Sequence, residues 1–142
     1  MIETKESIAV DTSTLLEYIE GTDLGKKFKL QFLENENITF FYITPLVQME
    51  LLYICCRKMG FDQAYTIITT FLKGFIIYEE SKLRESAARL KCQYAISIAD
   101  CYSLALAKIE NIPLFMKREI EIENILKKEK LPAEIIFIDD IE

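Results

Sequence analysis

Three carboxylates stand in apolar stretches of this chain, where a folded protein does not normally leave them. Asp11 follows the apolar run 7–10, Glu50 interrupts the run 46–54, and Asp100 lies inside the run 95–107. Burying a charged carboxylate is costly unless a cation or hydrogen-bond donors compensate. Three carboxylates in such settings indicate one shared cation, and the ion that oxygen ligands suit best is a hard divalent metal.

Glu50 gives the most distinctive of the three signals. If the run is helical, the residues three and four positions away are Leu46, Val47, Tyr53 and Ile54, so Glu50 lies on the apolar stripe of the helix. The alternative is a glutamate at the border of that stripe whose carboxylate reaches solvent.

Asp11 and Asp100 each have a second interpretation. Asp11 ends a predicted strand, at the edge of a parallel sheet where ligands bind, but Asp11, Thr12 or Ser13 would equally serve as the cap of the next helix. Ser97 and Asp100 have the spacing of a capping box. A carboxylate in the first helical turn can serve both the helix dipole and a metal.

A fourth acid follows another predicted strand. Glu119 would stand at the same sheet edge, although Glu119, Glu121 and Glu123 are each compatible with ordinary solvated helix charges. Lys117 and Arg118 lie beside it and could grip a phosphate. A solvent-facing turn is the alternative for these two cations.

Composition excludes several kinds of chemistry. The chain of 142 residues has no histidine, and its four cysteines form no CxxC pair. Zinc sites built from Cys and His, Ser-His-Asp or Cys-His catalysis, and histidine bases are therefore not expected. The net charge of −6 argues against broad adhesion to nucleic acid, but it is compatible with a nuclease that has a local basic patch and an acidic metal site.

The chain is expected to be one domain, residues 1–142, because no linker, repeat or low-complexity segment divides it. No apolar stretch is long enough to span a membrane. The first six residues are acidic and do not resemble a signal peptide. We therefore expect a cytoplasmic protein with reduced cysteines.

Short apolar segments alternate with longer amphipathic ones, which predicts an α/β fold with a largely parallel sheet. The expected strands are Ser7–Asp11, Ile38–Thr44, Gly74–Tyr78, Ile112–Met116 and Ile135–Asp139. The expected helices are Ser13–Glu20, Leu24–Asn35, Pro45–Met59, Asp62–Lys73, Ser81–Tyr94, Ile98–Glu110 and Glu119–Lys130. Thr44 followed by Pro45 suits the start of a helix.

In their order and spacing these pieces resemble the PIN domain family. The resemblance rests on three stretches, which are Ile8–Leu16 with its Asp-Thr-Ser start, Thr44–Leu51 with its helical glutamate, and Ile98–Ala107 with Ala-Asp before an alanine-rich helix. It covers nearly the whole chain, from Ser7 to about Asp139. It implies a three-layer α/β/α sandwich around a central, mainly parallel sheet of about five strands.

The resemblance also implies a function. Such a protein would be a Mg²⁺- or Mn²⁺-dependent endoribonuclease, often the toxin of a VapBC-type toxin–antitoxin pair. By position, Asp11, Glu50 and Asp100 would be the metal-binding acids, and Ser13 could hold a metal-bound water. The family often has a Thr/Ser-x-Asp segment after the fourth strand. Here that segment is Met116–Glu119, so either Glu119 replaces the missing acid with a longer arm or the site has three acids.

Two rival functions remain open. The altered segment is compatible with a catalytically weak or inactive binding module, and an α/β fold of this kind also hosts metal-dependent phosphohydrolases. Besides RNA, the expected partners are a small antitoxin and a second copy of the chain. The apolar helix Gln63–Leu72 would provide a homodimer or antitoxin surface, or else it is buried on two sides.

Overall fold

Within residues 6–142, which the computed structural model describes, five strands form one parallel sheet. Residues 1–5 lie outside the described residues. They make up most of the acidic N-terminal segment that was compared with a signal peptide in the sequence. The strands are β1 (Glu6–Val10), β2 (Ile38–Ile43), β3 (Ile76–Ile77), β4 (Leu114–Met116) and β5 (Ile135–Phe137). Their order across the sheet is β3-β2-β1-β4-β5, and every neighbouring pair is parallel.

This strand order reverses direction beside β1. The chain first proceeds from β1 to β2 and β3 on one side and then returns to add β4 and β5 on the other. In open parallel sheets the connections leave such a switch point on opposite faces, which opens a crevice at the carboxyl ends of the two central strands. The residues that follow β1 and β4 therefore lie close together in this crevice.

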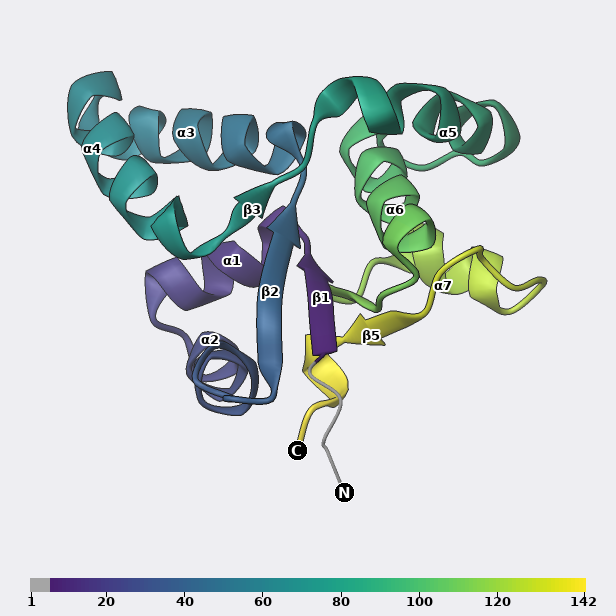
Figure 1. Ribbon diagram of the computed structural model, residues 1–142, viewed down its shortest axis with the longest axis horizontal. Coiled ribbons are helices and arrows are strands. Elements are labelled where there is room, and N and C mark those ends of the chain that lie inside the picture. Colours follow the sequence, from purple (N-terminus) through teal and green to yellow (C-terminus); the bar gives the residue numbers. More distant parts are fainter. Residues whose placement is uncertain (1–5) are drawn as a thin grey trace.

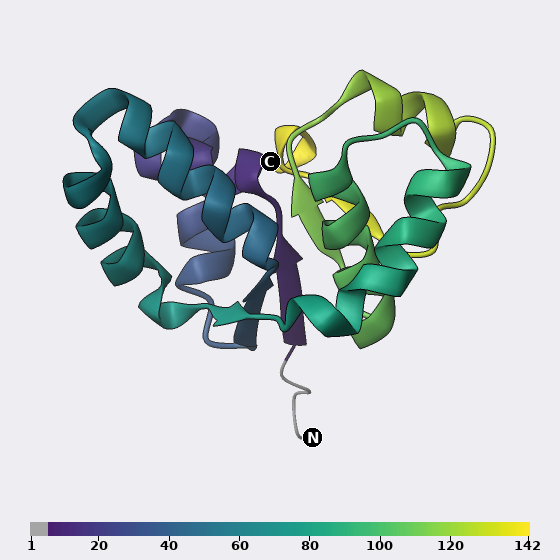
Figure 2. The ribbon, with the colours of Figure 1, turned by 90° about the horizontal axis from the view of Figure 1, so that it is seen from above.

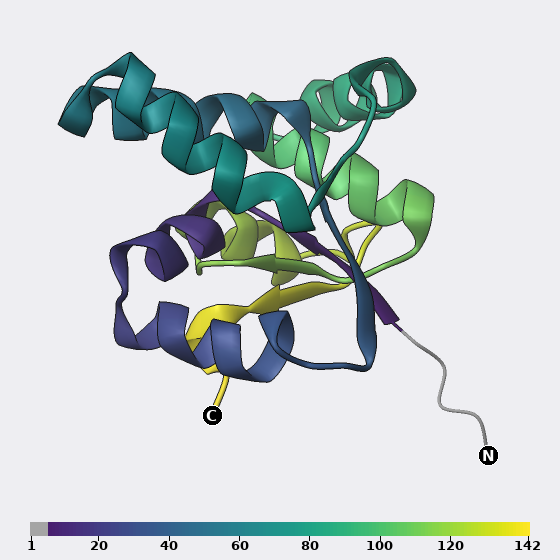
Figure 3. The same cartoon turned by 60° about the vertical axis from the view of Figure 1, so that its left-hand side comes forward.

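Helices connect the strands and cover both faces of the sheet (Figures 1 and 2). The α-helices are α1 (Thr12–Glu20), α2 (Asp23–Phe28), α3 (Pro45–Met59), α4 (Phe61–Phe71), α5 (Glu80–Gln93), α6 (Ile98–Glu110) and α7 (Ile120–Leu126). A π-helical turn, Lys29–Leu33, extends α2, and short 3₁₀ segments lie at Leu72–Gly74 and Ile138–Asp140. Figure 3 shows α1 and α2 stacked on one side of the strands.

Two separate hydrophobic cores show that the fold has three layers. Ala9, Leu114 and Met116 point into the core formed with α5, α6 and α7. Val10 and Phe115 point the other way, into the core formed with α1 to α4. This alternation follows from the two-residue period of a strand. The expected α/β/α sandwich with a parallel five-stranded sheet is confirmed.

Local chemistry explains where the helices that carry the acids begin. The hydroxyl of Thr44 accepts a hydrogen bond from the backbone N–H of Val47 at 3.2 Å, and Pro45 occupies the first turn. The hydroxyl of Ser97 accepts from the N–H of Asp100 at 3.0 Å. Both caps were expected, and both helices have the expected bounds.

The strands β3, β4 and β5 are shorter than the expected Gly74–Tyr78, Ile112–Met116 and Ile135–Asp139, and residues 138–140 form a 3₁₀ segment. Two helices differ from expectation by more than two residues. The segment predicted as Leu24–Asn35 is a six-residue α-helix that continues as a π-helical turn, while the last predicted helix ends at Leu126 instead of Lys130. Residues 127–130 are all exposed and three of the four are lysines. A helix here would repel its own charges and bury nothing, so packing gives it no support. No helix within residues 6–142 has the length and apolar character to cross a membrane.

Candidate metal centre

Three carboxylates from distant parts of the chain converge at the switch point of the sheet. Asp11 directly follows β1, Asp100 lies in the first turn of α6, and Glu119 lies in the turn between β4 and α7. Each offers a carboxylate oxygen within 4.8 Å of the other two. Asp11 is 4% exposed and Asp100 is 6% exposed, while Glu119 is half-buried.

The carboxylate of Asp11 is not used to cap α1. Asp11 occupies the cap position, but its side chain makes no capping hydrogen bond. Its Oδ2 instead accepts from the hydroxyl of Ser13 at 2.9 Å, and the Ser13 oxygen accepts from the backbone N–H of Lys117 at 3.0 Å. Ser13 thus links the residue after β1 to the residue after β4.

The capping role and the pocket role of the segment 97–100 occur together. Ser97 caps α6 through its hydroxyl, and Asp100 and Asp11 line the same pocket. Asp100 lies in the first turn of α6, where the partial positive charge of the helix end favours an anion.

Glu50 lies in the same pocket but outside the closest group. The pocket has a volume of about 200 Å³ and is lined by all four acids, together with Ser13 and Ser97. The Oε1 of Glu50 accepts a hydrogen bond from the hydroxyl of Thr12 at 2.8 Å. The sequence pointed to Thr12 only as a possible helix cap, and its place next to Asp11 was the one available hint of this contact.

Lys117 and Arg118 are both engaged by acids other than those of the pocket. The Nζ of Lys117 lies 2.6 Å from Oε1 of Glu17. The guanidinium of Arg118 pairs with Glu123 and Asp140. Within residues 6–142, no ion pair joins a lysine or arginine to Asp11, Glu50, Asp100 or Glu119.

The proximity of these acids perturbs their ionisation. Burial, and then the charge of Asp100, raises the pKa of Asp11 from 3.8 to about 7, against the lowering effect of the Ser13 hydrogen bond. Burial and then Glu119 raise the pKa of Asp100 from 3.8 to about 7. The pKa of Glu119 is raised as well, mainly by burial. Buried carboxylates that repel one another and lack a basic partner are the donor set that a divalent cation fits.

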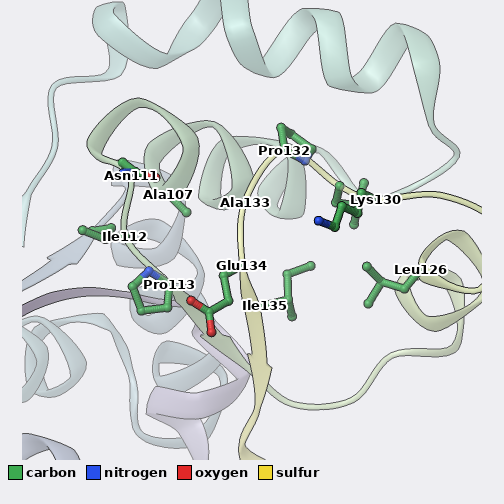
Figure 4. A pocket seen from close by; sticks show the side chains of 11 residues that line it. Ala107, Asn111, Ile112, Pro113, Leu126, Lys130, Pro132, Ala133, Glu134 and Ile135 are labelled. Carbon is green, nitrogen blue, oxygen red and sulfur yellow. The ribbon is translucent and has the colours of Figure 1, made fainter.

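Among the cavities larger than the pocket of the four acids, one of about 310 Å³ adjoins that pocket at Asp100 and Glu119, and two lie at the opposite edge of the sheet. One of these two, of about 480 Å³ and shown in Figure 4, is lined by residues before β4 and β5, including Pro113, Lys130 and Glu134. The other, of about 560 Å³, lies beside it. Neither of these two contains any of the four acids, so size alone does not mark the site of chemistry in this molecule.

Comparison with solved structures finds the same fold in toxin–antitoxin systems. VapBC-1 from nontypeable Haemophilus influenzae matches with a TM-score of 0.70 and 12% identity, covering 94% of this chain and 99% of that chain. VapC20 from Mycobacterium tuberculosis, described as a sarcin-ricin loop cleaving toxin, matches with a TM-score of 0.64 and 17% identity over 82% and 94%. A toxin–antitoxin complex from Klebsiella pneumoniae matches with 0.63 and 18% over 90% and 99%.

These identities are low enough that the likeness establishes the fold and no more. No curated protein matches the chain at a significant level. The sequence model of the PIN domain, however, matches residues 8–128, which include the last three residues of β1, all of β2, β3 and β4, and all four acids. The chain therefore belongs to the PIN domain family.

Proposed function

We propose that this protein is a Mg²⁺- or Mn²⁺-dependent endoribonuclease and the toxin of a toxin–antitoxin pair. The observation that carries the proposal is the convergence of Asp11, Asp100 and Glu119, whose oxygens lie within 4.8 Å of one another in a pocket that Glu50 also lines. Membership of the PIN family supports a nuclease. The fold shared with a toxin described as cleaving the sarcin-ricin loop supports RNA as the substrate.

The acids present fit a divalent cation. Asp11 and Asp100 would hold it, with Glu119 as a third donor and Glu50 bound directly or through water. Hard oxygen ligands suit both Mg²⁺ and Mn²⁺. When bound, such an ion neutralises the carboxylates, polarises a phosphate and makes water more acidic. Glu119 could alternatively serve a second ion near the leaving oxygen.

The chain's own residues orient this site. Ser13 holds one oxygen of Asp11, and Thr12 holds one oxygen of Glu50, so each carboxylate presents its other oxygen in a restricted direction. Such supporting contacts keep ligands in place and raise metal affinity. Because the chain has no histidine, proton transfer must involve the carboxylates or the metal. Ser13 could also hold a water of the metal.

Lys117 and Arg118 are proposed as contacts for a substrate phosphate. Each would have to exchange a carboxylate partner for the phosphate, since both are ion-paired in the free protein.

A protein partner is proposed for the surface of α3 and α4. Met49 and Tyr53 on α3 are 52% and 40% exposed, and Phe61 and Tyr65 on α4 are 56% and 53% exposed. Tyr65 lies in the segment Gln63–Leu72, which the sequence analysis predicted as a homodimer or antitoxin surface. Large exposed apolar side chains gathered on adjacent helices mark interaction surfaces. We propose that it binds an antitoxin or a second copy of the chain, as the VapBC complexes among the structural neighbours suggest.

The proposed activity is tested by cleavage of total RNA with Mn²⁺, with EDTA as the metal-free control. We expect Asp11→Asn and Asp100→Asn to reduce cleavage at least about 100-fold while the proteins stay folded. Asp62→Asn, an exposed aspartate on α4, should cleave as the unaltered protein does.

Other outcomes point to other functions. Normal cleavage by both site variants would show that the chosen acids are wrong. Absence of any heat on titration with millimolar Mn²⁺ would favour an inactive binding module. Hydrolysis of a small phosphate ester with RNA left intact would favour a phosphohydrolase.

A further inference from the structure

We propose that the ion pair between Glu17 and Lys117 positions Glu119 for metal binding, by fixing the turn after β4 to helix α1. The inference rests on the proposed metal site and assigns a role to two residues outside the pocket. Lys117 and Glu17 would be positioning residues, since neither carboxylate nor ammonium of the pair lines the pocket that contains the acids.

The carboxylate of Glu17 is held in place by contacts other than the one with Lys117. It projects from α1, and its side chain is only 13% exposed. The hydroxyl of Thr22 donates to it, and the same hydroxyl accepts from the backbone N–H of Gly25 at 3.1 Å. Glu17 is thus anchored to the beginning of α2, and its remaining oxygen lies 2.6 Å from Nζ of Lys117. An oriented, largely buried carboxylate makes a more specific anchor than a surface one.

The turn that carries Glu119 is fastened from two sides. On the α1 side, the backbone N–H of Lys117 donates to Ser13 and its side chain reaches Glu17. On the other side, the N–H of Arg118 donates to Oδ1 of Asp139 at 2.7 Å. The guanidinium of Arg118 also lies 4.7 Å from the centre of the Phe137 ring. Both residues that precede Glu119 are therefore fixed, Lys117 to α1 and Arg118 to β5 and the 3₁₀ segment that follows it.

Fixing is needed because Glu119 must hold its place against repulsion. Its carboxylate lies near Asp11 and Asp100, and when these two acids are ionised without a cation, like charges drive it away from them. Glutamate also has one more rotatable bond than aspartate, so it loses more side-chain entropy when held. A rigid backbone at residues 117 and 118 limits the positions that the side chain can reach, and this is the contribution we assign to the ion pair.

The experiment measures Mn²⁺ affinity of the full-length chain by calorimetry. Glu17→Gln and Lys117→Met should each raise the Kd by about 10-fold, at the lower end of the range for residues that support metal ligands. Lys117→Arg, which keeps the charge, should stay within about 3-fold of the unaltered protein. Glu20→Gln is the matched control, because Glu20 also lies on α1 and pairs with a lysine, Lys58, at 3.1 Å. It should leave the Kd unchanged.

A second background tests whether the ion pair acts through Glu119. In a Glu119→Gln protein, adding Glu17→Gln should change the Kd no further, because the ligand that the pair positions is already gone. An additional loss of the full size would overturn the proposal. If Glu17→Gln impairs folding, the Lys117 variants carry the test, since that side chain is 43% exposed.

The outcomes separate this inference from the proposed function. If the unaltered protein binds no Mn²⁺, both fail. If it binds Mn²⁺ and both Glu17→Gln and Lys117→Met bind equally well, only the inference fails. A raised KM for RNA in Lys117→Met with unchanged Mn²⁺ affinity would identify Lys117 as a phosphate contact and overturn the positioning role.

Discussion

The carboxylates of Asp11 and Glu119 lie within 4.8 Å of each other, although one follows the first strand and the other follows the fourth. Their meeting follows from the sheet register. Val10 of β1 is paired with Phe115 of β4, and the two strands are parallel. The residues after each strand therefore emerge at the same edge, and the turn 117–119 reaches back towards Asp11. The longer arm of a glutamate suits this approach.

Changing the length of this arm tests whether Glu119 is a ligand. Glu119→Gln should weaken Mn²⁺ binding by about 10-fold, and Glu119→Asp should also weaken it, because the shorter side chain no longer reaches the other acids from the same backbone. Glu134→Gln, an exposed glutamate before β5, is the control and should bind as before. Calorimetric titration measures all three. Unchanged binding in Glu119→Gln would leave Asp11, Glu50 and Asp100 as the metal ligands.

The raised pKa values of Asp11 and Asp100 predict how stability depends on pH in the absence of metal. Each carboxyl has a pKa of about 7 in the folded protein and 3.8 otherwise. Between these values the folded state keeps protons that the unfolded state has released. The free energy of unfolding contributed by these groups is therefore fully present below about pH 4 and is lost as the pH rises to about 7.

Asp100→Asn isolates this contribution. Against the unaltered protein in EDTA, the variant should have similar stability near pH 4 and should become more stable by roughly 1–3 kcal/mol near pH 8, because one of the repelling charges is gone. Thermal unfolding across this pH range measures the difference. Asp62→Asn should follow the unaltered protein throughout. A stability difference that does not vary with pH would contradict the raised pKa.

Ser13 is expected to matter through two hydrogen bonds at once. Ser13→Ala removes the donor to Asp11 and the acceptor of the Lys117 N–H. We expect a loss of roughly 1–3 kcal/mol in the free energy of unfolding, because a partly buried backbone donor loses its partner. Ser13→Thr keeps the hydroxyl and should recover part of the loss. Urea denaturation measures both variants, and equal stability of Ser13→Ala and the unaltered protein would show that the link is dispensable.

Gly25 permits the close approach of α2 to α1. A Cβ at this position would lie 2.1 Å from the backbone oxygen of Glu17 and 2.6 Å from Cα of Tyr18. Gly25→Ala should therefore destabilise the protein by about 2 kcal/mol or more, since backbone atoms cannot give way as a flexible side chain can. Gly74→Ala meets nothing within 4 Å and should be neutral or slightly stabilising. Equal melting temperatures for the two variants would be the contrary result.

The sequence allowed the elements near the acids to be predicted closely. Helices α3 and α6 have the bounds expected from their caps and apolar spacing, because Thr44 with Pro45 and Ser97 are strong local signals. The helix after β4 was predicted too long, since the charged residues 127–130 have the composition of a helix but no surface to pack on. Packing decides such ends, and it cannot be read from local spacing.

What the sequence by itself determined is which residues are out of place in their surroundings: an aspartate after a buried strand and a glutamate and an aspartate on apolar helix faces, within an alternating α/β pattern. Only the tertiary structure decided how these acids group. It places Glu119 beside Asp11 and Asp100, although the sequence around Glu119 is equally compatible with a solvated charge. It brings Thr12 to Glu50, whose carboxylate accepts a hydrogen bond from the Thr12 hydroxyl. It also turns Lys117 towards Glu17. Partners so far apart in the chain depend on sheet order and register, and those are set by the packing of all the layers together.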